Sequence, residues 1–244
     1  MEVEGDKMNF KEFEELINSG VKEISLNEDI SLEDKTQAPI EIKTDGLVID
    51  GKNHIIDGNN KLPILYIKAS NITLKNIIFK NGFSEDYSGA ITNYSNDLKV
   101  EHCQFIDNST ENAGDLYGGA IYNGENSKLT VEKSIFKEND SDFGGAIFID
   151  SDSTVKINNS VFELNISEFD GGAIYNKGEL IIDKSIFNQN MAFKGGAIFN
   201  ENSLTINDSH FKNNKASDGN DIQTENEDIS ISNSLCEFIN NDNY

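Results

Sequence analysis

Hydrophobic residues recur along this chain at a regular interval and in a constant order. The tetrapeptide Gly-Gly-Ala-Ile occurs four times, at 118–121, 144–147, 171–174 and 195–198. Each copy is followed by two aliphatic residues spaced by two, and then by the phrase Phe-x-x-Asn. A spacing of two places both aliphatic side chains on one face of a strand. A repeat of roughly 25 residues indicates stacked units rather than a compact globule.

When the repeats are aligned, constant apolar positions separate from variable ones. The two most constant columns are an isoleucine column, Ile91, Ile121, Ile147, Ile174, Ile198 and Ile222, and a phenylalanine column, Phe79, Phe105, Phe136, Phe162, Phe187 and Phe211. The position before each phenylalanine varies freely and is Gln104, Ile135 or His210 in three of the repeats. Constant apolar positions that alternate with variable ones predict strands with an inside and an outside.

Each repeat therefore predicts three short strands, at Gly-Ala-Ile, at the aliphatic pair and before the phenylalanine. A unit of roughly 25 residues cannot close a core alone, but stacked units bury a continuous one. No window after residue 20 has a sustained apolar period of 3.6 residues, which disfavours a helical solenoid. We predict an all-β fold, a parallel β-helix whose phrase Phe-x-x-Asn supplies a ladder of stacked asparagine side chains.

The first residues predict a different element. Residues 8–20 match a short amphipathic helix, with Asn9 as N-cap, Glu12 in the capping-box position and Gly20 at the C′ position. Its apolar stripe is Phe10, Phe13, Leu16 and Ile17. Such a helix would cover the open end of the first coil. We therefore expect one domain over residues 1–244, with a capping helix at about residues 8–20 and stacked coils over 21–244. The last repeat decays, so either a frayed last coil is tolerated or the chain is a piece of a longer protein.

The alternation of Gly-Gly-Ala-Ile with Phe-x-x-Asn resembles the repeat of the chlamydial polymorphic outer membrane proteins. The segments 47–58 and 69–79 resemble the opening of pectate-lyase-like β-helix domains, and are most similar to the large adhesin-like surface proteins of methanogenic archaea. This resemblance implies a single-stranded right-handed parallel β-helix. It also implies an adhesive module that is secreted or displayed at the cell surface.

The charge of the chain narrows the classes of molecule that it can bind. It contains 43 acidic and 20 basic residues, a formal net charge of −23, and every basic residue is lysine. Such a field repels nucleic acid and anionic lipid. No hydrophobic run approaches the ~20 residues of a membrane span, and no signal peptide opens the chain. We expect an extracellular or cell-surface location, no nucleic-acid partner and no membrane insertion. The expected partner is a host or microbial surface protein or a glycan.

The position after each constant isoleucine is the candidate binding site. It holds Tyr122, Phe148, Tyr175 and Phe199 in successive repeats. If isoleucine points inward, its neighbour leaves the other face of the strand, so these rings form an outward stripe. An exposed apolar stripe is typical of a partner surface. Two alternatives remain open: loops fold over the stripe, or the rings only stabilise one another.

Acidic residues precede most Gly-Gly turns, at Glu85, Asp86, Asp115, Asp142, Glu168, Asp170 and Asp218. Stacked carboxylates repel one another, and Ca²⁺ would relieve that repulsion by taking six to eight oxygens. The calcium-binding repeat Gly-Gly-x-Gly-x-Asp is absent, so we expect solvated loops rather than a metal site. No cofactor is predicted, and Ca²⁺ is the one ion that the pattern allows.

Catalysis is the alternative to a binding module. The resemblance to polysaccharide lyases implies a basic residue, commonly arginine, that removes a proton; this chain has no arginine, which leaves Lys99 or Lys156. Glycoside hydrolases need two carboxylates with opposed roles, and such pairs arise by chance among 43 acids. The sequence therefore favours a non-catalytic adhesin-like or spacer module over a lyase or hydrolase acting in a groove of the β-helix.

Overall fold

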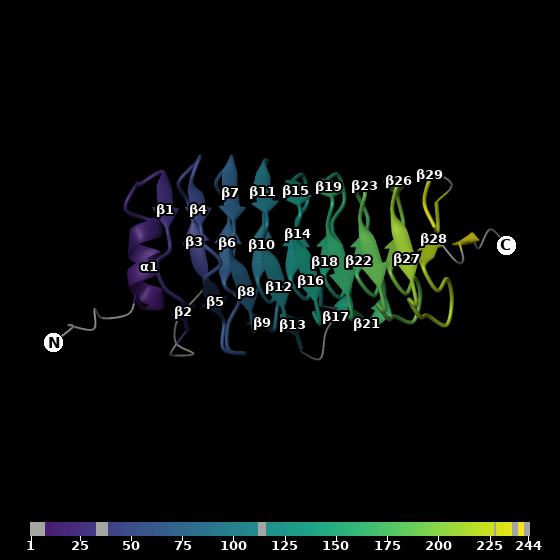
Figure 1. The fold of residues 1–244 in the computed structure, drawn as a ribbon, viewed down its shortest axis with the longest axis horizontal. Helices are drawn as coiled ribbons and strands as arrows, with labels where there is room; N and C mark the ends of the chain where they lie inside the picture. The colour runs from purple at the N-terminus through teal and green to yellow at the C-terminus, as the bar shows by residue number, and fades with distance from the viewer. Residues whose placement is uncertain (1–7, 33–38, 112–115, 227, 236–238, 242–244) are drawn as a thin grey trace.

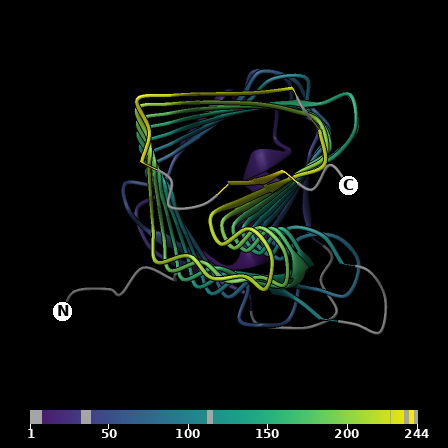
Figure 2. The same ribbon diagram turned by 90° about the vertical axis from the view of Figure 1, so that its right-hand side faces the viewer.

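The computed structural model describes residues 8–32, 39–111, 116–226, 228–235 and 239–241. The chain winds into an elongated parallel β-helix, as predicted, with a short helix near its N-terminus (Figure 1). A view along the stack shows successive coils superimposed on one another (Figure 2). Every strand pair that joins neighbouring coils is parallel, because equivalent segments of successive repeats run in the same direction.

Three long sheets correspond to the three predicted strands of each repeat. The aliphatic-pair sheet contains β1 (Glu23–Ser25), β4 (Val48–Asp50), β7 (Ile72–Lys75), β11 (Leu98–Glu101), β15 (Lys128–Glu132), β19 (Thr154–Asn158), β23 (Glu179–Asp183), β26 (Ser203–Asn207) and β29 (Ile229–Ser232). The isoleucine sheet contains β3 (Ile40–Ile42), β6 (Leu65–Ile67), β10 (Ile91–Asn93), β14 (Ile121–Asn123), β18 (Ile147–Ile149), β22 (Ile174–Asn176), β25 (Ile198–Asn200), β28 (Ile222–Thr224) and β30 (Ile239–Asn241). The phenylalanine sheet contains β2 (Ile30–Ser31), β5 (Ile55–Asp57), β8 (Ile78–Lys80), β12 (Gln104–Ile106), β16 (Ile135–Lys137), β20 (Val161–Glu163), β24 (Ile186–Asn188) and β27 (His210–Lys212).

A fourth, shorter sheet was not predicted. It consists of β9 (Phe83–Ser84), β13 (Ser109–Thr110), β17 (Asp140–Phe143) and β21 (Ile166–Asp170), which run along the lower edge of the solenoid in Figure 1. Isolated bridges from Ile166 to Met191 and from Met191 to Lys215 continue its row beyond β21. Its inward residues are serine and threonine, as at Ser84, Thr110 and Ser141, so the strands lack the apolar alternation that reveals the other three sheets.

The constant apolar columns form the core, as predicted. Ile121 pairs in register with Ile91 and Ile147, and every member of the isoleucine column is fully buried. In the phenylalanine column neighbouring rings stack with centroids 4.6 to 5.0 Å apart and are tilted by no more than 17°. The variable position before each phenylalanine faces outward, because Ile135 and Ile186 are 37% and 43% exposed.

The asparagines of Phe-x-x-Asn form the expected ladder inside the coil. Asn139 Nδ2 donates to Asn165 Oδ1 in the next coil at 2.9 Å and to the carbonyl of Phe105 at 3.1 Å. The same two bonds recur at Asn165, whose Nδ2 lies 2.9 Å from Asn190 Oδ1 and 3.0 Å from the carbonyl of Phe136. Because each amide satisfies both of its N–H groups, these polar side chains are stable in a water-free interior.

The Gly-Gly pairs are required by close contact between coils. Gly144 has φ +66°, a conformation that favours glycine. A Cβ on Gly145 would lie 2.3 Å from the carbonyl oxygen of Ile166 and 2.4 Å from that of Gly172 in the following coil. Any larger residue at the second position would push neighbouring coils apart and break the bonds between them.

Helix α1 (Phe10–Ile17) covers the first coil, where it packs against β2 and β3. Asn9 is its N-cap, and the predicted capping box with Glu12 is present. Phe10, Phe13 and Ile17 are buried against the core, while Leu16 is partly buried. The helix is shorter than the predicted residues 8–20, because it ends at Ile17 with Asn18 as C-cap. Gly20, expected at the C′ position, therefore lies one residue beyond it.

Candidate functional site

The predicted binding stripe lies outside the core, on the outer face of the isoleucine sheet, but it is not exposed to solvent. We call the residues that follow the constant isoleucines the inner column: Tyr66, Thr92, Tyr122, Phe148, Tyr175, Phe199 and Gln223. They pair in register on the outer face of the isoleucine sheet, as alternation requires. Yet Tyr122, Phe148, Tyr175 and Phe199 are only 6%, 3%, 6% and 2% exposed. The stripe therefore points away from the core, as predicted, but it is not open to solvent.

The segments that enter the Gly-Gly turns cover the inner column. They carry a second set of aromatic residues, which we call the outer ridge: Tyr87, Tyr117, Phe143, Phe169 and Phe193. Tyr117 lies 4.5 Å from Phe148, and Phe143 meets Tyr175 edge-on at 5.5 Å between centroids. A glycine with positive φ opens each of the four Gly-Gly turns, at Gly118, Gly144, Gly171 and Gly195, and the aromatic residue lies one or two positions before it. The structure shows both features that the sequence left open: loops cover the column, and its rings also stack on one another, with the centroids of Phe148 and Tyr175 5.1 Å apart.

Three residues of the outer ridge and two of their neighbours are exposed apolar side chains. Tyr87 is 43% exposed, Phe169 42% and Phe193 55%. Ile166 and Met191, which pair in the row of the fourth sheet, are 41% and 46% exposed. These five residues are the majority of the nine exposed large hydrophobic residues in the described part of the chain. Because such residues gather on one face, that face is the best candidate for a partner surface.

Sequence reasoning missed the outer ridge, although a signal was present. An aromatic residue stands directly before the Gly-Gly pair at Tyr117 and Phe143, but two residues before Gly171 and Gly195 at Phe169 and Phe193. This slip of one position hides the column from an alignment of repeats. The acidic residues of the same loops predict solvated loops rather than packed ones.

The inner column is a rigid support for the ridge. The Tyr122 hydroxyl donates to Asp150 and the Tyr175 hydroxyl donates to Glu201. Burial, and then these hydrogen bonds to carboxylates, raise the pKa of both tyrosines far above the usual value, so both stay protonated. The ring face of Tyr175 also meets a cation, since Lys177 Nζ lies 5.4 Å from its centroid.

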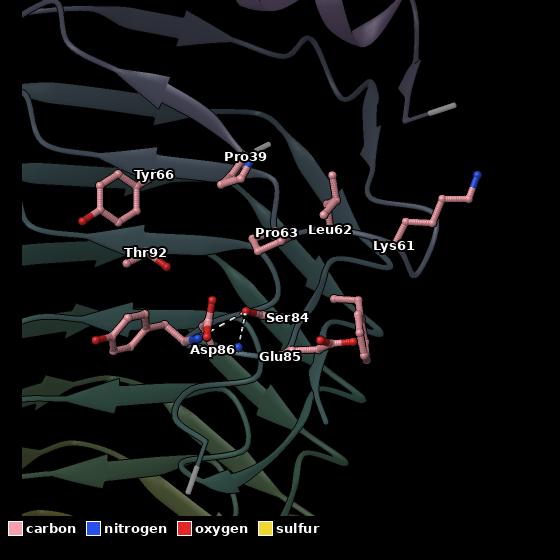
Figure 3. Close-up of a pocket in the computed structure, with 11 residues that line it drawn as sticks. Pro39, Lys61, Leu62, Pro63, Tyr66, Ser84, Glu85, Asp86 and Thr92 are labelled. Atoms are coloured by element: carbon pink, nitrogen blue, oxygen red, sulfur yellow. Dashed lines mark hydrogen bonds between the residues drawn. The ribbon is translucent and has the colours of Figure 1, made fainter. Parts of the chain in front are cut away.

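A hollow opens at the end of the inner column nearest the N-terminus. Thr92 occupies a position that is aromatic in the next four coils. The ring of Tyr94, two residues on, contacts both Tyr66 and Tyr122, with centroids 5.7 and 6.0 Å apart. The hollow has a volume of about 550 Å³ (Figure 3). Its wall consists of Pro39, Lys61, Leu62, Pro63, Tyr66, Phe83, Ser84, Glu85, Asp86, Tyr87 and Thr92. A small side chain in an otherwise bulky column thus creates a site that a partner group can enter.

Hydrogen bonds hold the acidic edge of this hollow in place. Ser84 Oγ accepts from the backbone N–H groups of Asp86 at 3.1 Å and Tyr87 at 3.2 Å (Figure 3). Ser84 itself is buried, and its hydroxyl fixes the turn that presents the exposed Asp86 and Tyr87. The Oγ atom of Ser88 lies 3.1 Å from Oγ1 of Thr92, which fastens the floor of the hollow to the same turn.

The predicted acidic loops lie along the same face. A second hollow of about 520 Å³ is lined by Glu111, Asp140, Asp142 and Glu168, together with Ser109, Thr110, Ser141 and Ile166. Asp140 stays in contact with solvent, but partial desolvation in this hollow, followed by repulsion from Asp142, Glu111 and Glu168, raises its pKa above the usual value. Burial likewise raises the pKa of Asp170, although Lys194 opposes the shift. Of the predicted acidic positions, Asp115 lies outside the described residues.

These carboxylates do not converge as metal ligands. Within the described ranges, no group of three or more histidine, cysteine or acidic side chains is arranged to hold a metal ion. The oxygens that Ca²⁺ requires are therefore spread along the face rather than gathered at one point.

The two lysines considered for catalysis lie on the outer face of the aliphatic-pair sheet, away from the ridge. Lys99 Nζ is 2.9 Å from Glu132 and 3.4 Å from Glu101. The hydrogen bond to Glu132 raises the pKa of Lys99, which keeps it protonated and unsuited to removing a proton. Lys156 lines a separate hollow of about 600 Å³ together with Lys128 and Glu179. Lys99 and Lys156 are two coils apart, with Thr130 between them in register.

Comparison with known proteins places the chain in one family. A family model described as a right-handed β-helix region matches residues 28–168, more than half of the chain. The chain therefore belongs to the right-handed β-helix family, and its coil is right-handed, as the resemblance implied. No curated protein and no solved structure matches it. This fold occurs in adhesins and in polysaccharide lyases alike, so the family alone does not decide the activity.

The structure also bears on the expectation about membranes. Among the residues described here, no helix has the length and apolar character needed to cross a bilayer.

Proposed function

We propose that this protein is a non-catalytic, adhesin-like binding module that uses the outer ridge as a lateral contact face. The observation that carries the proposal is the concentration of exposed large apolar side chains there, represented by Tyr87, Phe169 and Phe193. A solenoid of stacked coils presents such a face as a long, straight surface. The inner column supports the ridge from below, so the exposed rings are held in place before a partner arrives.

The resemblance of the repeats to adhesive β-helical surface proteins supports this proposal. It also supports a location outside the cell or at its surface, where the partner is a surface protein or a glycan. Under this proposal the contact residues are not Tyr122, Phe148, Tyr175 and Phe199 themselves, because loops cover them. Among those four residues, Tyr122 supports the exposed ring of Tyr87, with 4.9 Å between the two centroids.

A polysaccharide lyase or glycoside hydrolase is the second candidate. The observation in its favour is the hollow beside Lys156 and Glu179, where a cation and a carboxylate share one wall on the aliphatic-pair sheet. Incubation with acidic polysaccharides and Ca²⁺ tests this alternative. Unsaturated or reducing ends that disappear in Lys156→Ala would replace the binding proposal with an enzymatic one.

The binding proposal is tested with a defined panel of purified surface proteins and glycans. The ridge variant carries Phe169→Ser and Phe193→Ser in the outer ridge, together with Met191→Ser in the adjacent row of the fourth sheet. The matched control carries Ile135→Ser and Ile186→Ser, which remove exposed apolar side chains from the outer face of the phenylalanine sheet. We expect a panel member that binds the natural protein and the control but not the ridge variant. Equal binding by both variants, or no binding to any member, would contradict a contact role for the ridge.

A further inference from the structure

Carboxylates are interleaved with the exposed rings of the outer ridge. Asp86 and Glu85 stand beside Tyr87, and Glu168 stands beside Phe169. Each of these five side chains is exposed. An aromatic face next to a carboxylate attracts a cation twice, through the ring quadrupole and through the charge. The net charge of −23 adds a long-range attraction for basic partners and repels acidic ones.

The molecule already uses its aromatic columns to bind its own ammonium groups. Lys68 Nζ lies 4.8 Å from the centroid of Tyr66 while it pairs with Glu41 at 3.1 Å. Lys194 Nζ lies 5.7 Å from the centroid of Phe199. At Tyr66 a ring and a carboxylate share one lysine. A foreign cationic side chain would make the same kind of contact with Tyr87 and Asp86 in the adjoining hollow.

The hollow above Thr92 fits such a side chain. Its volume of about 550 Å³ exceeds what one extended lysine or arginine side chain needs, and Pro39, Pro63 and Leu62 offer an apolar wall to the methylene stem (Figure 3). Asp86 lies on the opposite side of the hollow, where it can accept from the charged end. Long cationic side chains bury their stems in this way while the head group keeps a polar partner.

We propose that the outer ridge binds a basic segment of a partner protein, with one lysine or arginine side chain inserted into the hollow formed by Tyr66, Tyr87 and Asp86. This inference rests on the proposed function, since it names the chemistry of the partner that the ridge contacts. Charge complementarity selects the occupant. The hollow is lined by two carboxylates, Glu85 and Asp86, and by one cation, Lys61; the rest of its wall is largely apolar and aromatic, and the surrounding field is negative.

The probe is a fluorescein-labelled octapeptide of alternating arginine and serine, used with the full chain in a fluorescence anisotropy titration. Its counterpart carries citrulline in place of arginine, which keeps the shape and removes the charge. We expect the arginine peptide to bind at least about five-fold more tightly than the citrulline peptide, and its affinity to fall as salt is raised.

Two matched pairs of variants separate a specific site from general electrostatics. Asp86→Asn is compared with Asp152→Asn, which removes the same charge from an exposed turn elsewhere. Tyr87→Ser is compared with Ile186→Ser, because both residues are 43% exposed. Asp86→Asn and Tyr87→Ser are expected to weaken the arginine peptide by about three- to ten-fold, and the two controls by less than about two-fold.

The outcomes distinguish this inference from the proposed function. Equal, small losses in Asp86→Asn and Asp152→Asn mean non-specific attraction and overturn the inference. Equal binding of arginine and citrulline peptides, lost in the ridge variant, overturns the cationic partner while the binding face stands. Tighter binding of a glucosamine hexamer than of the arginine peptide, with loss in the same variants, replaces the basic protein segment by an amino-sugar polymer. Circular dichroism of each variant confirms that the coil is intact.

Discussion

Two aromatic columns run along the stack, and they are built under different constraints. The phenylalanine column lies inside the coil, repeats one residue and stacks almost in parallel, with a tilt of 2° between Phe136 and Phe162. The inner column lies outside the isoleucine sheet, mixes tyrosine with phenylalanine and tilts by 39° between Tyr175 and Phe199. Three sheets enclose the first column, whereas turns of variable length cover the second.

The difference shows where the chain tolerates variation. A ring in the core is closely packed on all sides, and phenylalanine recurs at six successive levels from Phe79 to Phe211. A ring of the inner column is covered by a turn that can adjust its path. Thr92 can therefore replace an aromatic residue at one level and leave a hollow, while the coil below it stays regular. Variation of this kind changes the binding face without changing the fold.

The largest expected effect is in the core. Phe162→Ala removes a fully buried ring that stacks at 4.7 Å on both Phe136 and Phe187. The free energy of unfolding should fall by about 3–5 kcal/mol, because the two neighbouring rings cannot close the cavity. Urea denaturation followed by circular dichroism measures the loss.

The control for this variant is its neighbour. Val161→Ser changes an outward, partly buried residue of the same strand and should cost less than about 1 kcal/mol. Comparable losses at Phe162 and Val161 would refute the assignment of inside and outside.

The inner column should show a smaller loss. Phe148→Ala removes a ring that is 3% exposed, and the free energy of unfolding should fall by about 2–4 kcal/mol, since the turn that carries Tyr117 can partly settle into the space. Phe193→Ser is the matched change in the outer ridge and should stay within about 0.5 kcal/mol. If Phe148→Ala cost as little as Phe193→Ser, the ring would not be the support that we describe.

The asparagine ladder provides the next test. Asn165→Ala removes one of the two acceptors of Asn139 Nδ2 and the acceptor of the Asn139 backbone N–H. It also leaves Asn190 Oδ1 without one of its donors. We expect a loss of about 2–3 kcal/mol, because buried polar groups without partners cost more than an average hydrogen bond contributes. Asn188→Ala removes a bond from Asn188 Nδ2 to Glu163 near the surface, and its loss should stay below about 1 kcal/mol. Thermal melts that rank the two variants in the opposite order would contradict a structural role for the ladder.

The smallest effect concerns the acidic face. Because the pKa of Asp140 is raised in the folded state, the unfolded chain loses this proton first as pH increases. Stability therefore falls between pH 3.8, the unperturbed value, and the folded pKa, and stays lower above it. Asp140→Asn should raise the melting temperature at pH 7, and this gain should vanish below about pH 3.8. Asp152→Asn is the control, and an equal gain there would point to net charge instead.

The sequence predicts the core more completely than the face outside it. The registers of Ile121 and Phe136, the capping box at Asn9 and the ladder through Asn165 all follow from spacing, because each depends on a residue that recurs at the same position. Alternation also gives correctly the side of the strand from which Tyr122 leaves. It cannot state what lies above that side chain, because the covering turn belongs to a different part of the repeat.

Two features escaped prediction for related reasons. The fourth sheet turns serine and threonine inward, so strands such as β13 and β17 resemble loops in their polarity. The outer ridge slips by one residue between Phe143 and Phe169, which removes it from any strict column. Both features depend on how the turns fold back on the coil. That path is set by three-dimensional contacts, such as those of Tyr117 with Phe148, rather than by local pattern.

The ladder of asparagines has a direction and two ends. It begins at the backbone N–H of Gly82, which donates to Asn108 Oδ1, and every amide then donates to the next coil until Asn214 reaches the carboxylate of Asp221. A carboxylate accepts without donating onward, so it terminates the series. Removal of one whole turn, such as residues 140–165, would bring Asn139 onto Asn190 and leave every amide satisfied. The length of this rod, and hence the distance over which it holds its contact face, is therefore adjustable in complete units by duplication or loss of short gene segments.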